Sequence, residues 1–292
     1  MDFKMPRDKQ VGELEEFQIL ERELNYLADF FGSLDNLISV FGNSITFFLG
    51  NKLYRFDTVA LKSCSQTLKS IKYCCSIGSF GDANTLVRKL RDDLIQFAYF
   101  LVIINKREPF LDDSFNDKKT NDEEALEKWI MNTIHYSECP ILRKKLDIKN
   151  YMDVIGDYNR VKHILKEYNL TTMWKELSYH LNNYVHNNGI SYSKRNCING
   201  YDSKAIEYLN EVKKNVSYVS SVFVILVLLI ESKLFGSTDY IDYCECGLEP
   251  VEDSQYFIAP FVQEFIDNTI KVLHPELLEF LKGSNSNGMF ID

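Results

Sequence analysis

Apolar residues recur every three or four positions along most of the chain, which is the spacing of an amphipathic helix. The pattern begins clearly in residues 11–49, where Leu14 and Phe17 start an apolar stripe. Gly32 and Ser33 form a candidate break within that stripe. We therefore expect residues 11–49 to be helical, as one helix or as two.

The same spacing predicts helices along the rest of the chain, with ends set by capping residues, glycine and proline. The first expected helix is capped by Asp57 and ends near Gly78, and the second starts at Asp82 or Asn84 and stops before Pro109. A third is expected over residues 125–133, followed by short helices over 153–168. The last two are a helix capped by Thr171 or Thr172 and closed by an Asn-Gly pair, and a helix over 203–234. The polar residues 111–122 are expected to form a surface loop.

The helix over residues 203–234 has two different halves. Its first half carries Glu207, Glu211, Lys213 and Lys214, which we expect to face water. Residues 216–230, VSYVSSVFVILVLLI, hold no charge. A membrane span needs about 20 apolar residues, so we interpret this shorter, serine-containing run as a core helix buried on every side. A membrane-spanning segment is the alternative.

The fold class predicted from this pattern is all-α, a multi-helix bundle with an irregular C-terminal wrap. The low content of Gly (13) and Pro (6) in 292 residues agrees, because an all-β fold needs many turns. We expect residues 1–235 to form the bundle. Residues 236–292 are aromatic and acidic, and we expect them to wrap it, with short helices near 253–270 and 275–281.

Charge and cysteines narrow the classes of function. The formal charge of −9 does not attract nucleic acid to the chain as a whole, so any such contact must be a local basic patch. Seven cysteines without CxxC spacing favour reduced thiols in the cytoplasm, and the polar N-terminus predicts no signal peptide. We expect no metal and no cofactor. The alternatives are half a metal site at Cys244 and Cys246 and a cation site in the acidic residues 239–253.

Two helices carry candidate chemistry, while the common phosphate-loop, GxSxG and HExxH motifs are missing from the sequence. On the first helix, Arg91 lies at the border of the apolar face and Arg88 lies further round. These guanidinium groups suit a phosphate or a carboxylate. The alternative is an ordinary amphipathic helix with a solvated charged face.

On the second helix, Tyr179, Asn182 and His186 share one polar stripe, while His180 lies at the border of the apolar face. A solvated face normally carries Lys and Glu, and neither occurs in this helix after Glu176. A histidine in such a stripe can act as a general acid or base. The alternative is a polar interface buried against the tail or against another subunit.

The segment LSYHLNNYVHNNG resembles the fourth helix of the HEPN superfamily of helical bundles, whose motif is an Arg followed after four to six residues by a His. The resemblance covers about residues 79–190, within a core of about 54–190. His186 matches the motif's His, whereas His180, Leu181 and Asn182 occupy the places open to its Arg. Members of the family commonly dimerise and cut RNA without metal, and the resemblance is nearest to uncharacterised bacterial members.

The resemblance implies an effector directed at RNA or a nucleotide, of the metal-independent ribonuclease or toxin type, in bacterial stress or phage defence. In that hypothesis His186 takes the proton of a ribose 2′-hydroxyl, Asn182 and Tyr179 orient the phosphate, and Arg88 or Arg91 stabilises the developing charge. The expected partners are RNA or a nucleotide and a second copy of the chain, with no membrane. The alternative is a non-catalytic scaffold that has lost the HEPN arginine and binds a protein partner or a small ligand.

Overall fold

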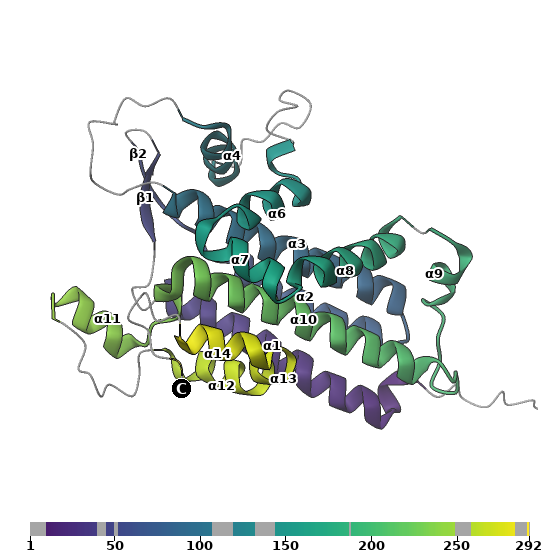
Figure 1. Cartoon of the computed structure of the whole chain (residues 1–292). Coiled ribbons are helices and arrows are strands. Elements are labelled where there is room, and N and C mark those ends of the chain that lie inside the picture. Colours follow the sequence, from purple (N-terminus) through teal and green to yellow (C-terminus); the bar gives the residue numbers. More distant parts are fainter. Residues whose placement is uncertain are drawn as a thin grey trace, which may run out of the picture. The chain divides into compact units, whose positions relative to one another are not determined.

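The computed structural model describes residues 10–39, 45–49, 52–106, 119–131, 144–186, 188–248, 258–283 and 291. Helices dominate these residues, and the one sheet among them has two strands. The prediction of an all-α, multi-helix fold is therefore confirmed (Figure 1).

The first long element is helix α1, Glu15–Ser39, which follows a short 3-10 turn at Val11–Glu13. It passes through Gly32 and Ser33 without a break. The predicted helix does not reach residue 49, because β1 (Thr46–Leu49) pairs with β2 (Lys52–Arg55) as an antiparallel hairpin. Exposed and buried residues alternate along β1, which is the two-residue period of a strand.

The next two helices begin near the predicted caps. Helix α2 is Val59–Ser76, and the Asp57 carboxylate accepts a hydrogen bond from the Val59 N–H at 2.7 Å. Helix α3 is Phe80–Asn105 and begins two residues before the earlier of its predicted starts. Ser79 directly precedes the helix, and its hydroxyl donates to the carboxylate of Asp82, which is the third residue of the helix and not its cap, at 2.7 Å.

The middle of the chain forms shorter helices. Helix α4 begins with a capping box made by Thr120 and Glu123. Residues 121 and 122, predicted to belong to a loop over 111–122, are therefore helical, and most of the rest of that loop lies outside the described residues. The elements are α4 (Asn121–Ile130), α6 (Ile148–Gly156), α7 (Asn159–Glu167), α8 (Leu170–Val185) and α9 (Ile190–Lys194).

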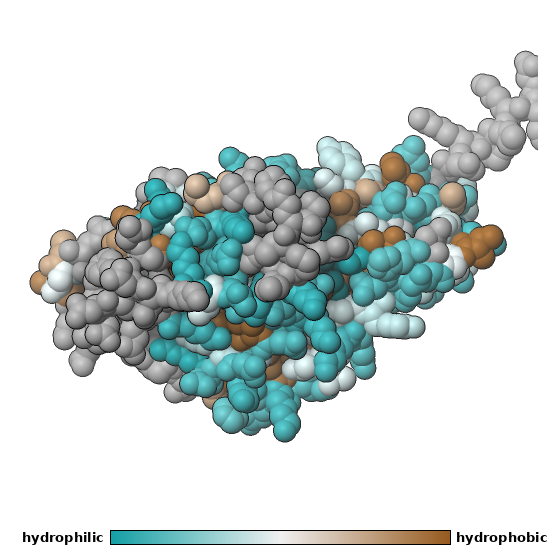
Figure 2. Space-filling view, turned by 90° about the horizontal axis from the view of Figure 1, so that it is seen from above, coloured by the Kyte–Doolittle hydropathy of each residue, from teal (hydrophilic) through white to brown (hydrophobic). Residues whose placement is uncertain are grey.

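Helix α10, Ala205–Glu231, continues into a 3-10 turn at Ser232–Phe235. Every side chain from Asn215 to Ile230 is buried, as predicted for a core helix. In the described residues one stretch, Ala205–Phe235, is long and apolar enough to cross a membrane, and 89% of its most apolar window is buried inside the protein. On the face drawn in Figure 2, the coloured residues are mostly hydrophilic, with separated hydrophobic spots.

The C-terminal part is more regular than predicted. Residues expected to be irregular form α11, where the Ser237 hydroxyl accepts a hydrogen bond from the Tyr240 N–H and caps the first turn. The predicted closing helices are present, the first one shorter. The elements are α11 (Thr238–Glu245), α12 (Pro260–Phe265), a π-helical turn (Ile266–Ile270), α13 (Lys271–Leu273) and α14 (Pro275–Gly283).

Contacts divide the chain into two compact units. Unit 1 comprises residues 1–32, 62–91 and 171–220, and unit 2 comprises residues 33–61, 92–170 and 221–292. Unit 1 contains 16 Lys and Arg against 13 Asp and Glu, a formal +3, whereas unit 2 contains 17 against 29, a formal −12. The acidity of the chain therefore belongs to unit 2. The core of unit 1 includes Leu24, Leu68, Val87, Leu181 and Val212.

Candidate functional site

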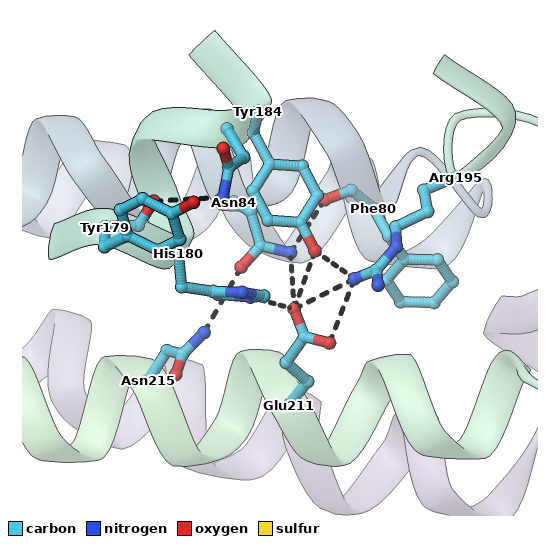
Figure 3. Close-up of polar contacts among 9 residues, drawn as sticks. Phe80, Asn84, Tyr179, His180, Tyr184, Arg195, Glu211 and Asn215 are labelled. Atoms are coloured by element: carbon cyan, nitrogen blue, oxygen red, sulfur yellow. Dashed lines mark hydrogen bonds and ion pairs between the residues drawn. The ribbon is translucent and has the colours of Figure 1, made fainter. Parts of the chain in front are cut away.

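A cluster of polar side chains surrounds Glu211 in unit 1, on the first half of α10. We predicted that Glu211 faces water, and that prediction is wrong: its side chain is only 21% exposed. The charged neighbours Glu207 and Lys214 are exposed, as expected. Glu211 differs because donors from three other segments of unit 1 surround its carboxylate. The Glu211 cluster consists of Asn84, His180, Tyr184, Arg195 and Glu211 (Figure 3).

The donors crowd one oxygen of the carboxylate. The Tyr184 hydroxyl donates to Oε1 at 2.7 Å, and His180 Nε2 lies 2.8 Å from the same atom. Arg195 Nη1 lies 3.2 Å from Oε1 and 3.0 Å from Oε2, so it bridges both oxygens. A carboxylate held by an imidazole, a phenol and a guanidinium has one fixed orientation.

Helix α8 supplies two of these donors. His180 and Tyr184 are four residues apart and therefore lie on one face of the helix, where their rings meet edge to face at 5.3 Å. Leu177 and Leu181 are buried and anchor the helix on its apolar side. This packing directs the side chain of His180, which lies at the border of the apolar face, toward α10.

Arg195 reaches the cluster from the segment that follows α9. Its guanidinium also donates to the Tyr184 hydroxyl. Three aromatic rings surround it: the guanidinium carbon lies 4.5 Å from the ring centre of Tyr208, 5.3 Å from that of Tyr184 and 5.8 Å from that of Tyr192. Ring faces attract a cation, so these tyrosines hold the arginine in place along with the carboxylate.

The N-terminus of α3 holds the backbone that carries Arg195. The Phe80 N–H donates to the Arg195 carbonyl at 2.9 Å, and the Ile198 N–H donates to the Gly78 carbonyl at 3.3 Å. Gly78 has φ +77, and a Cβ placed there would lie 1.8 Å from the Ile198 carbonyl oxygen. Only glycine admits this approach.

A neighbouring bond fastens the same segment. The side-chain oxygen of Asn196 accepts the Asp82 N–H at 3.0 Å, and its amide nitrogen donates to the Asp82 carboxylate at 3.2 Å. The position of Arg195 therefore depends on residues that do not touch Glu211.

Burial and hydrogen bonding set the ionisation of the cluster. Burial alone would raise the pKa of Glu211, but the hydrogen bonds from His180 and Tyr184 outweigh it and lower that pKa. Burial and the negative charge of Glu211 both raise the pKa of Tyr184. The pKa of Arg195 is raised, because its anionic and phenolic surroundings outweigh its burial. Glu211 and Arg195 are accordingly charged and Tyr184 neutral near neutral pH.

The arrangement leaves one ring nitrogen of His180, Nδ1, outside the contact with Glu211. When the proton of neutral His180 sits on Nε2 and is donated to Glu211, Nδ1 is the acceptor. The side chain of His180 is 36% exposed. A carboxylate that fixes the tautomer of a half-buried imidazole is the arrangement of a general base.

The residues predicted for catalysis on α8 lie away from this cluster. Tyr179 is 75% exposed, and its carbonyl accepts a hydrogen bond from the Asn183 side chain at 3.1 Å. His186 is exposed at the end of the helix, where its N–H donates to the Asn182 carbonyl at 3.1 Å. Asn182 is half-buried, and its side-chain oxygen has no hydrogen-bond partner among the described residues.

The two predicted arginines have different surroundings. Arg91 is 1% exposed, and its guanidinium carbon lies 5.8 Å from the ring centre of Trp174. Arg88 is half-buried. His186 lies at the exposed end of α8, whereas Arg91 is buried beside Trp174 on the same unit.

Sequence reasoning did not select Tyr184, Arg195 or Glu211. Tyr184 lies on the apolar face of its helix, where a tyrosine is usually counted as core. Arg195 lies in a loop, and Glu211 belongs to a run of ordinary charged positions. One signal in the sequence was the four-residue separation of His180 and Tyr184, which places both side chains on one face of the helix.

No protein-family model, curated protein or solved structure matches the chain. The HEPN resemblance therefore rests on its sequence motif.

In the part of the chain that the structure describes, no three His, Cys, Asp or Glu side chains gather as metal ligands. The acidic residues 249–253 lie outside the described residues, as does the side chain of Cys244, so both alternative metal sites fall partly outside them.

Proposed function

We propose that the chain is a HEPN-like enzyme that cuts RNA without a metal, and that His180, rather than His186, handles the proton. The observation that carries the proposal is the 2.8 Å contact between His180 Nε2 and Glu211. It supports an imidazole whose Nε2–H donates to the carboxylate, which leaves Nδ1 as the ring atom that can accept a proton. Stress or phage defence, the cytoplasmic location and the homodimer remain proposals that derive from the sequence.

The proposed reaction is an internal transfer at the phosphodiester. His180 Nδ1 takes the proton of a ribose 2′-hydroxyl, and that oxygen attacks the adjacent phosphorus. The bond to the 5′-oxygen of the next nucleotide breaks, and the imidazolium returns the proton to this leaving oxygen. The products are a 2′,3′-cyclic phosphate and a free 5′-hydroxyl, so atoms and protons balance without a co-reactant.

Arg195 is the cation that this mechanism assigns to the phosphate. Only Nη1 of its guanidinium takes part in the hydrogen bonds to Glu211 and Tyr184, and an arginine has further N–H donors suited to phosphate oxygens. The formal +3 of unit 1 supports the approach of a polyanion to this part of an otherwise acidic chain.

The second candidate is a non-catalytic scaffold. The ion pair between Arg195 and Glu211 at 3.0 Å favours it, because two charges that neutralise one another also serve to join helices. In this alternative the Glu211 cluster stabilises unit 1, and RNA is left intact.

The test is incubation of the purified full chain with end-labelled RNA in the presence of EDTA. We expect cleavage that leaves cyclic phosphate ends. His180→Ala should lower the rate by about 10²-fold or more, the usual contribution of a general acid or base.

His186→Ala is the matched control, because it removes an exposed imidazole from the same helix, and its rate should stay within about twofold of the wild type. Loss in His186→Ala with full activity in His180→Ala would return the role to His186. No cleavage by the folded wild-type protein would overturn the proposal in favour of the scaffold.

A further inference from the structure

A buried pair of amide side chains lies beside the Glu211 carboxylate. Asn84 on α3 is 1% exposed and Asn215 on α10 is 8% exposed. The Asn215 side-chain nitrogen donates to the Asn84 side-chain oxygen at 3.3 Å (Figure 3). An amide without a partner is costly to bury, so a pair at this depth in unit 1 calls for a reason.

The bonds of Asn84 define which way its amide points. Its nitrogen donates to the Phe80 carbonyl at 3.0 Å and lies 3.5 Å from Glu211 Oε1. With the oxygen taken by Asn215, one N–H of the amide goes to the Phe80 carbonyl and the other is directed at the carboxylate. Asn84 therefore presents a neutral donor to the same oxygen that contacts His180.

We infer that Asn84 is a positioning residue for the proposed reaction: it holds Glu211 Oε1 in place and sets the pH at which His180 exchanges its proton. The role of Asn84 in catalysis rests on the proposed function, whereas its effect on the contact between His180 and Glu211 does not depend on it.

The charge on Glu211 is shared among the groups that donate to it. Among the described residues, the charged or titratable groups in contact with the His180 ring or with Glu211 include Glu211 itself from α10, Tyr184 from the same helix as His180, and Arg195 from the segment after α9. From α3 the carboxylate is contacted by the uncharged amide of Asn84. Removal of that donor leaves more negative charge for His180 to neutralise, which favours the imidazolium.

The experiment follows the ring protons of His180 by NMR during a pH titration of the full chain, with the resonance assigned from its loss in His180→Ala. Asn84→Leu should move the titration midpoint upward by about half a pH unit. Asn84→Asp, which places a second carboxylate beside Glu211, should move it upward by about one unit or more. In active protein, the acidic limb of the pH–rate profile should shift in the same direction.

Thr85→Val is the matched control. The Thr85 hydroxyl donates to the Gly81 carbonyl at 3.0 Å, so this variant also removes a side-chain bond to the residue four positions earlier in α3, and the midpoint should not move. If the Asn84 variants do not fold, Asn215→Leu releases the Asn84 oxygen instead and should also shift the midpoint.

An unchanged midpoint in folded Asn84 or Asn215 variants, with only a loss of stability, would overturn the inference. Because the titration needs no RNA, this failure is distinct from the failure of the proposed function, which appears as intact RNA.

Discussion

The Glu211 cluster of unit 1 and a second carboxylate cluster in unit 2 are built from similar parts. The cluster in unit 2, called the Asp122 cluster, consists of Tyr99, Asp122, Lys145 and Asn150. There the Tyr99 hydroxyl donates to the Asp122 carboxylate at 2.6 Å, and Lys145 Nζ lies 3.2 Å from the same carboxylate. Each cluster thus joins a buried tyrosine, a carboxylate and a cation. In each, burial and the carboxylate raise the pKa of the tyrosine.

The clusters differ in what else contacts the carboxylate. Glu211 contacts a half-buried imidazole, and its arginine is surrounded by aromatic rings. Near Asp122 the neutral neighbour is Asn150, which lies 3.5 Å from the Tyr99 hydroxyl. A tyrosine paired with a carboxylate is therefore shared by the two clusters, and the group that distinguishes the Glu211 cluster is the imidazole of His180.

The largest effect should come from Gly78→Ala, which disturbs the Glu211 cluster from outside. The new Cβ would meet the Ile198 carbonyl, and φ +77 is strained for alanine. We expect a loss of about 3 kcal/mol in the free energy of unfolding, measured by urea denaturation.

Gly156→Ala at the end of α6 is the control for this change, because a Cβ there meets nothing within 4 Å. Its stability should stay within about 1 kcal/mol of the wild type. Equal losses in the two variants would mean that the segment carrying Arg195 is not held as described.

A smaller effect should separate the two carboxylates themselves. Glu211→Gln removes the charge partner of Arg195 and places an amide N–H group opposite several N–H and O–H donors. We expect a loss of about 2–3 kcal/mol in the free energy of unfolding at pH 7. Asp122→Asn removes a more exposed pair and should lose about 1 kcal/mol. A larger loss in Asp122→Asn would make the unit 2 cluster the more important structural link.

The smallest effect concerns a histidine of unit 2. Burial lowers the pKa of His274, whose Nε2 lies 3.1 Å from the Ser221 hydroxyl. A folded pKa below the unfolded value of about 6.5 means that the unfolded chain binds the proton more readily. Stability is therefore complete above that value and falls as the pH drops below it.

The measurement for His274 is the free energy of unfolding between pH 7.5 and 5, for the wild type and for His274→Gln. The variant should show the flatter pH dependence. Parallel curves would contradict the assigned role of burial.

The sequence predicted helices well because their signal is local. Capping by Asp57 and the buried second half of α10 follow from neighbouring residues and apolar spacing. The hairpin at residues 46–55 was missed because a strand of four residues gives only two alternations to recognise.

The candidate site depends on contacts between residues far apart in the chain. Glu211 and Asn84 are separated by 127 positions, and no period in the sequence links them. The stripe of Tyr179 and His186 has the expected helical spacing, but its exposed position follows from the packing of Leu177 and Leu181, which spacing alone leaves open.

The apolar half of α10 imposes an order on biosynthesis. The ribosome completes residues 216–230 well before α13 and α14, yet Ser221 contacts His274, which joins those two helices. Until residue 274 has left the exit tunnel, the nascent chain exposes an uncharged, apolar segment, because the residues that bury it have not yet been synthesised. Truncation before residue 258 would make that transient condition permanent, and chaperones would encounter this segment first.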